Sequence, residues 1–233
     1  MSPRRLSDDC LSCSLRHEGD FCCLPGALHS RFNDLGTLTI YPSHVVLMSE
    51  GQPPRGVYIP CSGRIKLSAV AKDGKTVILR VARERDVLGL SSIVSGRPSP
   101  FEATTMEPCQ IKFIERDAFL GLIGANSEVA MAAARLLSRE IGQAFDDVHQ
   151  LLLARSSTEK LARLLLSWVA KHPENRDLRV HSAFTHEEMA QMIGSSRETV
   201  TRLLSDMRRR ELIRLEGSTL VIPNRIALET LAS

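Results

Sequence analysis

Near the C-terminus, two short amphipathic segments flank a single glycine, a pattern that few folds accommodate. Thr185 and Glu188 have the three-residue spacing of a capping box, and Ser195 and Glu198 repeat that spacing. Gly194 lies between the two segments and permits a sharp turn. Two short helices joined in this way form a helix-turn-helix, whose second helix inserts its N-terminal end into the major groove of DNA.

The exposed start of the second helix carries side chains that suit DNA bases. Arg197 and Arg202 can each pair bidentately with guanine. Glu198, which can accept from the cytosine amino group, and Thr201 lie beside them. Three neighbouring hydroxyl groups are better suited to phosphates: Ser195, Ser196 and Thr199. The apolar residues follow the helical period and are predicted to form the local core: Met189, Ala190, Ile193, Val200, Leu203, Leu204 and Met207.

The segment after the second helix predicts a two-stranded hairpin. Glu211–Leu215 and Thr219–Ile222 are the expected strands, with Glu216-Gly217-Ser218 as the turn. A hairpin in this position makes the motif a winged helix. The arginines at 208–210 extend its basic face. A solvated helix with another role could carry the same arginines, but the turn, the capping boxes and the hairpin together favour duplex DNA as the partner.

Between about residues 35 and 115, short apolar runs alternate with turn signals such as Asp73-Gly74 and Ser95-Gly96. Runs of this length and spacing predict the strands of a β-barrel or a double-sheet roll. The expected strands are Thr37–Tyr41, Val45–Met48, Gly56–Pro60, Ile65–Ala71, Thr76–Ala82, Ala103–Thr105 and Gln110–Ile114.

A long helix is predicted from Glu128 to Arg155, with apolar residues that alternate in steps of four and three. This heptad seam favours a coiled-coil contact with a second copy of the chain, although packing on the protein's own roll is an alternative. Glu140 and Asp147 fall on flanking positions, where acids repel one another across a two-fold axis. The seam residues are Ala130, Ala134, Leu137, Ile141, Ala144, Val148 and Leu151.

These patterns divide the chain into a cysteine-rich arm (1–30), a β-roll (31–125), a dimerisation helix (126–155) and a winged-helix domain (156–233), an α+β fold. The arm lacks a clear period, so its order is expected to come from something other than a core. No run of 18 apolar residues and no signal-peptide core is present, which predicts a cytoplasmic protein. The 6 cysteines therefore favour metal or redox chemistry over disulfides.

The order of roll, long helix and winged helix resembles the cyclic-AMP receptor protein and fumarate–nitrate-reduction regulator superfamily. The most specific match is Gly194–Leu204, which is similar to the recognition helix of these regulators. The resemblance implies a cyclic-nucleotide-binding-like roll and a homodimer that binds an inverted repeat and contacts RNA polymerase. The cyclic-nucleotide binders carry a carboxylate after a glycine and an Arg-Ser pair. Here no carboxylate follows Gly89, and Ser99-Pro100 stands near the Arg-Ser position, so cyclic AMP is not expected.

The oxygen-sensing branch of that superfamily carries an N-terminal cysteine cluster and one distant cysteine in the roll. This chain resembles it in Cys10, Cys13, the adjacent Cys22 and Cys23, and Cys109 in Glu107-Pro108-Cys109-Gln110-Ile111. The resemblance implies a [4Fe–4S] cluster on Cys10, Cys13, Cys109 and one of the adjacent pair. Loss of the cluster is expected to weaken the dimer, through Cys109 and the strand that follows it.

The same cysteines leave other chemistries open. A zinc site, with His17 as a further candidate ligand, or a thiol–disulfide switch between Cys10 and Cys13 would use the same residues. Another effector such as haem, or no cofactor, also stays open. A metal-dependent redox protein is an alternative of a different class. No nucleophile elbow, phosphate-binding Walker loop or His-Glu-x-x-His motif is present, so catalytic activity is not expected.

Overall fold

The computed structural model describes residues 13, 21–24, 26–153, 156–170, 179–181, 184–216 and 219–232. The described residues up to 142, apart from 75–77, form one compact unit, and 75–77 with the residues from 143 onward form the other. This boundary falls inside the long helix. Each unit is considered separately below.

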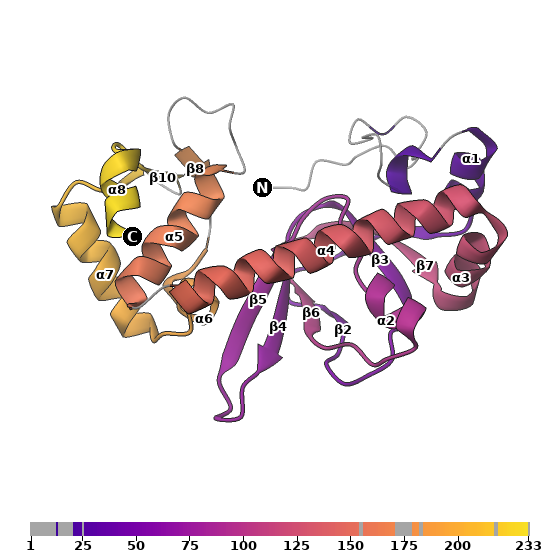
Figure 1. Cartoon of the computed structure of the whole chain (residues 1–233), viewed down its shortest axis with the longest axis horizontal. Helices are drawn as coiled ribbons and strands as arrows, with labels where there is room; N and C mark the ends of the chain where they lie inside the picture. Colours follow the sequence, from indigo (N-terminus) through magenta and orange to yellow (C-terminus); the bar gives the residue numbers. More distant parts are fainter. Residues whose placement is uncertain are drawn as a thin grey trace. The chain divides into compact units, whose positions relative to one another are not determined.

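The first unit contains two antiparallel sheets, coloured purple to magenta in Figure 1. The first has the order β1-β7-β3, with β1 Thr37–Tyr41, β7 Cys109–Glu115 and β3 Gly56–Ser62. The second has the order β2-β6-β4-β5, with β2 Val46–Met48, β6 Glu102–Thr105, β4 Ile65–Val70 and β5 Thr76–Ala82. All of the strands predicted for the roll are confirmed, with their ends shifted by at most two residues.

The β1-β7-β3 sheet separates two hydrophobic cores because successive side chains of a strand point to opposite faces. Val57 and Ile59 of β3 belong to one core with Ile114 of β7. Tyr58, between them, belongs to the other core together with Ile111. The register agrees, since Val57 pairs with Ile114. We call the face toward Tyr58 the inner face and the face toward Val57 the outer face.

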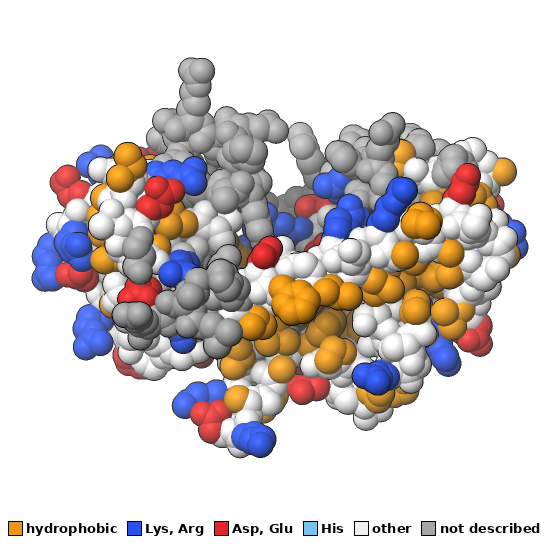
Figure 2. Space-filling model, viewed as in Figure 1, with side chains coloured by type: hydrophobic (Ala, Val, Ile, Leu, Met, Phe, Trp, Pro, Cys, Tyr) orange, Lys and Arg blue, Asp and Glu red, His pale blue; other side chains and the backbone are white. Residues whose placement is uncertain are grey.

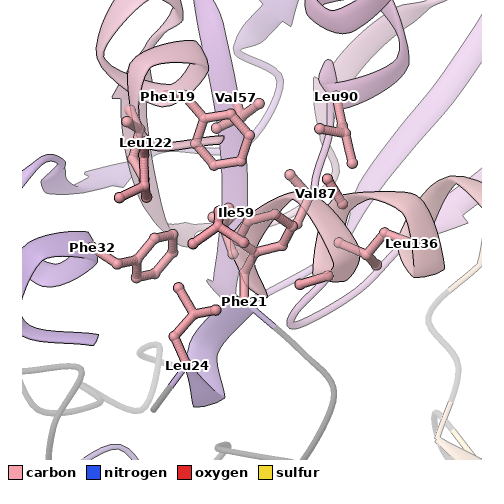
Figure 3. Packing of buried hydrophobic residues seen from close by; sticks show 14 of the residues in the cluster. Phe21, Leu24, Phe32, Val57, Ile59, Val87, Leu90, Phe119, Leu122 and Leu136 are labelled. Atoms are coloured by element: carbon pink, nitrogen blue, oxygen red, sulfur yellow. The ribbon is translucent and has the colours of Figure 1, made fainter. Parts of the chain in front are cut away.

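Helices cover the outer face. They are η2 Phe21–Cys23, α1 Gly26–Asp34, α2 Leu90–Ser95, α3 Arg116–Ala125 and the first half of α4 Ser127–Leu153. The side chain of Phe21 is 1% exposed, and its ring lies 5.2 Å from that of Phe119. Figure 3 shows Phe21 beside Ile59, Val87 and Leu136. The described part of the arm is therefore ordered by the core, contrary to the sequence-based expectation.

One face of α4 packs on this core through Val129, Ala132, Ala133 and Leu136. Another face is apolar and exposed: Met131 is 54% exposed, Ile141 59%, Phe145 70% and Val148 52%. Figure 2 shows a band of hydrophobic side chains along this helix. Of the other predicted seam residues, Ala134 and Ala144 are exposed, Ala130 and Leu137 are half-buried, and the side chain of Leu151 lies outside the described residues.

Within the described residues, no single helix is long and apolar enough to cross a membrane. The pair formed by α3 and residues 127–146 of α4 passes that test only when joined, and it is bent by 114°.

The second unit contains α5 Ser157–Ala170, α6 His186–Ile193, α7 Arg197–Arg209 and α8 Arg225–Leu231. Its small sheet has the order β8-β10-β9, with β8 Arg179–His181, β10 Thr219–Val221 and β9 Arg214–Glu216. The rings of Trp168 and Phe184 stack at 4.7 Å and help to bring α5 to the start of α6. The winged helix is thus confirmed, and β8 and α8 add to what the sequence predicted.

Candidate nucleic-acid interface and cysteine region

The first helix of the motif, α6, begins at a complete capping box. The Thr185 hydroxyl accepts from the backbone N–H of Glu188 at 3.1 Å, and the Glu188 carboxylate accepts from the backbone N–H of Thr185 at 2.7 Å. Gly194 ends the helix in the left-handed conformation, at φ 62°. This conformation strains residues with a side chain, so glycine suits the turn. Both features are as predicted.

The second helix, α7, is capped one residue later than predicted. The Ser196 hydroxyl accepts from the backbone N–H of Thr199 at 3.2 Å, so Ser196 is the cap and the predicted box of Ser195 with Glu198 is wrong. Ser195 instead places its hydroxyl 3.5 Å from the hydroxyl of Ser157 on α5. Two helix starts of the second unit therefore meet at Ser195.

The predicted reading residues share one exposed face of α7. Arg197, Glu198, Thr201 and Arg202 are all exposed, as is Ser196, whereas Ser195 and Thr199 are half-buried. The opposite face is buried through Val200, Leu204 and Met207, and Leu203 is half-buried. The helix is thus held by its apolar side and presents two arginines and a carboxylate to solvent, an arrangement that can address base edges in a major groove.

The hydroxyl of Thr201 has two partners within the motif. It donates to the backbone carbonyl of Arg197, one turn earlier, at 2.9 Å. It also lies 2.8 Å from Nδ1 of His186, the first residue of α6. Sequence reasoning did not single out His186, because the two residues are separated by the turn and meet only through the packing of α6 on α7.

The arginines that follow the recognition helix are partly compensated. Asp206, which is half-buried, pairs with the exposed Arg209 and, at 3.7 Å, with the exposed Arg210. Exposed pairs of this kind contribute little to stability, but they reduce the local positive charge. The predicted extension of the basic face is therefore weaker than the three consecutive arginines imply.

Cys109 begins β7 and lies on the inner face, where it is fully buried. Its thiol donates to the backbone carbonyls of Glu107 at 3.1 Å and Arg64 at 3.4 Å. Burial, together with the nearby Glu107 carboxylate, raises the pKa of the Cys109 thiol to about 11. A Cβ on Gly63 would lie 2.6 Å from the sulfur, so the turn at Gly63 closes over it.

The other described cysteines have different surroundings. Cys22 and Cys23 are half-buried in η2, and Cys22 packs on the outer-face core. Cys13 and Cys61 are also half-buried, and Cys10 lies outside the described residues. Among the residues that the structure describes, no three His, Cys, Asp or Glu side chains are grouped closely enough to hold a metal ion.

An iron–sulfur cluster needs thiolates. As it is placed, Cys109 offers no open ligand position, because its sulfur is enclosed by the turn at Gly63 and bonded to two backbone carbonyls. Cys109 on the inner face and Cys22 on the outer face are thus not brought together in the described part of the chain, and the predicted ligand set stays a prediction. Sequence alone could not reveal the face on which Cys109 lies. Side chains of β7 alternate between the two faces, and only the assembled sheet shows which face is which.

A family model for the Crp-like helix-turn-helix domain matches residues 159–231, and one for the cyclic nucleotide-binding domain matches residues 38–126. The "CRP-like cAMP-activated global transcriptional regulator" of Mycobacterium tuberculosis is 31% identical over 184 residues, which cover 78% of this chain and 82% of that protein. The chain belongs to the CRP/FNR family of transcription regulators. It is thus a DNA-binding regulator and not an enzyme.

The chain is also similar to a second curated protein and, in fold, to a solved structure. The "Global nitrogen regulator" of Synechococcus elongatus is 28% identical over 182 residues, which cover 76% of this chain and 82% of that protein. The structure of FixK2 from Bradyrhizobium japonicum shares the fold with a TM-score of 0.73 at 23% identity, and the match covers 85% of this chain and 98% of FixK2.

The part of the roll that corresponds to the cyclic-nucleotide motif lacks the motif's two charged positions and is hydrogen-bonded within the roll. Gly89, at φ 88°, precedes α2, and Leu90 follows it where a carboxylate would stand. Ser99 is buried, and its hydroxyl donates to the carbonyl of Phe101 at 2.6 Å. Backbone bonds join Ser99 to Gly51 and Gln52 at 2.8 and 2.9 Å. Serine is uncharged, so this position supplies no cation for a nucleotide phosphate. Its hydroxyl proton is already donated to the Phe101 carbonyl.

Glu140 lies differently from its predicted position beside the dimer seam. The side chain is half-buried, and its pKa is raised by burial, with Asp86 raising it further and Arg80 lowering it. It therefore faces the protein's own roll, where Arg80 and Asp86 lie 3.9 Å apart. The side chain of Asp147 lies outside the described residues. The proposed repulsion between protomers thus loses Glu140 as a contributor.

Proposed function

We propose that this regulator is a homodimer that binds inverted-repeat promoter DNA through α7, contacts RNA polymerase, and is controlled by an oxygen- or redox-labile iron–sulfur cluster on its N-terminal cysteines. The observation that carries the DNA-binding part is the exposed face of Arg197, Glu198 and Arg202 on a helix whose opposite face is buried. Bases are proposed to be read by the two arginines and the glutamate, and phosphates to be bound by Ser195, Ser196 and Thr199.

The exposed apolar face of α4 supports the dimer. Met131, Ile141, Phe145 and Val148 are each more than half exposed and recur at helical spacing along one side of the helix. A band of this kind on a regulator marks a protein interface. Because a second copy offers the same band, a two-fold contact would bury it on both protomers, and two recognition helices would then require an inverted repeat.

The packing of η2 supports the location of the sensor. Phe21 is adjacent to Cys22 and shares one core with Leu136 of α4. A chemical change at the cysteines can therefore bear on the dimerisation helix through Phe21. This route adds to the predicted one through Cys109. We infer that the cluster ligands are thiolates of Cys10, Cys13, one of Cys22 and Cys23, and Cys109, which would have to leave its enclosed position to join the other three.

Cyclic AMP is the second candidate effector, because the Mycobacterium tuberculosis relative is described as cAMP-activated. Two observations weigh against it: the Ser99 hydroxyl is hydrogen-bonded to the Phe101 carbonyl, and no carboxylate follows Gly89. Zinc, a thiol–disulfide switch and haem remain alternatives for the cysteine arm.

The deciding experiment begins with full-length protein purified without oxygen. We expect a brown protein with iron and sulfide near four of each per chain, as a [4Fe–4S] cluster requires. Its affinity for an inverted-repeat duplex, measured by fluorescence anisotropy, should fall after exposure to air. Cys13→Ser and Cys109→Ser should each lose the chromophore, and of Cys22→Ser and Cys23→Ser only the change at the ligand should do so. A colourless protein with one zinc, or one whose DNA affinity responds only to added cyclic AMP, would contradict the cluster.

A further inference from the structure

We propose that Thr201 reads a thymine through its methyl group, and that His186 is a positioning residue that holds the threonine for this task. The inference rests on the proposed role of α7 in DNA recognition and names one feature that the helix reads. It is carried by two hydrogen bonds of the Thr201 hydroxyl at the exposed reading face, one with the Arg197 carbonyl and one with His186 Nδ1.

The first step concerns the hydroxyl proton. A threonine hydroxyl has one proton to donate and two lone pairs that accept. In Thr201 the proton is directed to the backbone carbonyl of Arg197 at 2.9 Å. The contact of 2.8 Å with His186 must then run the other way, with Nδ1–H of the imidazole as donor and the hydroxyl oxygen as acceptor. The hydroxyl consequently has no proton left for a guanine, adenine or thymine acceptor.

The second step concerns what remains for DNA. Thr201 is exposed, between Arg197 and Arg202 in the surface pattern of α7. With the oxygen fixed by partners from two helices, the stiff β-branched side chain is held in one rotamer. One lone pair of the oxygen is left for a base amino group, and the other group that Thr201 presents to DNA is its methyl. The major-groove feature that matches this methyl is the C5 methyl of thymine, which no other standard DNA base carries.

The third step concerns His186. Its ring comes from the first turn of α6, whose start is fixed by the Thr185 capping box. The bond from His186 therefore ties the first helix of the motif to the reading face of the second. Without it, the Thr201 rotamer is determined by the Arg197 carbonyl alone, and we expect the methyl to be less well placed. Asparagine can supply an N–H donor near the position of Nδ1, so it is the conservative replacement.

The test uses deoxyuridine, which differs from thymidine only by the missing C5 methyl. The full-length protein is titrated against an inverted-repeat duplex in which each thymine pair, one per half-site, is replaced in turn. We expect one position at which the replacement weakens wild-type binding by about fourfold per half-site, the factor expected for burying one methyl group. Thr201→Val should keep this sensitivity, because it retains a methyl, and Thr201→Ser should lose it.

His186 is tested on the same duplexes. His186→Ala should reduce the deoxyuridine effect at that one position, and His186→Asn should restore it. A histidine that merely bound phosphate would change affinity equally for thymine and deoxyuridine duplexes. Circular dichroism melting shows whether each variant is folded before it is titrated.

The outcomes separate the two levels of the proposal. If the wild type binds no inverted-repeat duplex more tightly than random DNA, the proposed function fails. If it binds specifically but no deoxyuridine substitution matters, or if Thr201→Ser remains sensitive to one, the methyl readout is overturned while the proposed function stands. Loss of sensitivity in Thr201→Val would also overturn it, because valine keeps a β-branched methyl at the same position.

Discussion

On the inner face of the β1-β7-β3 sheet, Cys109 is sealed among apolar side chains and bonded to backbone carbonyls. On the outer face, Cys22 is half-buried next to Phe21, which packs against the dimerisation helix. The same residue type is thus fully buried on one side of the sheet and half-buried on the other. Thiol chemistry follows the fraction of thiolate and its access, so the outer face is the side from which a signal can reach α4.

The largest expected effect is on the outer face. Phe21→Ala should lower the free energy of unfolding of the first unit by about 3–5 kcal/mol, because it removes a fully buried ring and leaves a cavity. Urea denaturation of the full-length protein measures the loss. Phe113→Ala is the matched change on the inner face, where the ring is half-buried against Tyr58 at 4.8 Å, and it should cost less.

The milder pair Phe21→Leu and Phe113→Leu sharpens the comparison at the level of function. Both variants should fold, but only Phe21→Leu should change the difference in dimer dissociation constant between oxygen-free and air-exposed protein. Sedimentation velocity measures both states. An equal response of the two variants would place the coupling somewhere other than the outer-face core.

The next largest effect concerns the turn over Cys109. Gly63 has φ +86°, and an added Cβ would lie 2.6 Å from the Cys109 sulfur and 2.9 Å from the Pro108 carbonyl oxygen. Gly63→Ala should therefore destabilise the protein by about 2–4 kcal/mol, from backbone strain and overpacking combined.

Gly74→Ala is the control, because Gly74 has a similar φ of +81° and nothing within 4 Å of its Cβ position. It should show only the backbone contribution, about 1–2 kcal/mol. Equal losses in thermal or urea unfolding would mean that the sulfur is not enclosed by the turn.

Local sequence signals predicted the elements that local physics determines. The alternating runs, the Thr185 box and Gly194 located the strands and the motif because turn chemistry and side-chain period act over a few residues. The short helices α1 and α2 and the strand β8 were missed, since tertiary contacts stabilise them. The shift of the α7 cap from Ser195 to Ser196 has a similar cause, because Ser195 contacts Ser157 on another helix.

The candidate site divides in the same way. The reading residues of α7 follow from helical period alone, so Arg197 and Arg202 were predicted from sequence and are exposed together. Cys109 and His186 depend on which elements meet in space. Cysteine spacing carries no information about sheet faces, and the partnership of His186 with Thr201 crosses a turn.

The rates of thiol labelling test directly whether Cys109 on the inner face is less accessible than the cysteines on the outer face. In cluster-free, reduced protein at pH 8, iodoacetamide should modify Cys109 about 100-fold more slowly than an ordinary thiol, because a pKa near 11 against the usual value of 9.0 leaves that much less thiolate. Burial should slow the reaction further. Mass spectrometry of the digested protein reports each site. Labelling of Cys109 as fast as that of Cys23 would show that the inner face opens readily.

The smallest expected effect lies where α4 meets the roll. Burial raises the pKa of Glu140, with Asp86 adding to the rise and Arg80 opposing it, so the folded protein binds this proton more tightly than the unfolded chain. The stability contribution of Glu140 is then full below the usual glutamate pKa and is lost as pH rises through the raised value. Glu140→Gln removes the charge that is costly to bury. It should stabilise the protein by less than about 1 kcal/mol at pH 7.5, with the gain vanishing near pH 4.

Urea titrations at the two pH values measure this difference, and Glu84→Gln, at an exposed position in the same unit, is the control. A gain for Glu140→Gln that is the same at both pH values would mean that packing and not charge is responsible. A loss at pH 7.5 would mean that attraction to Arg80 outweighs burial, and that Glu140 fastens the dimerisation helix to the roll.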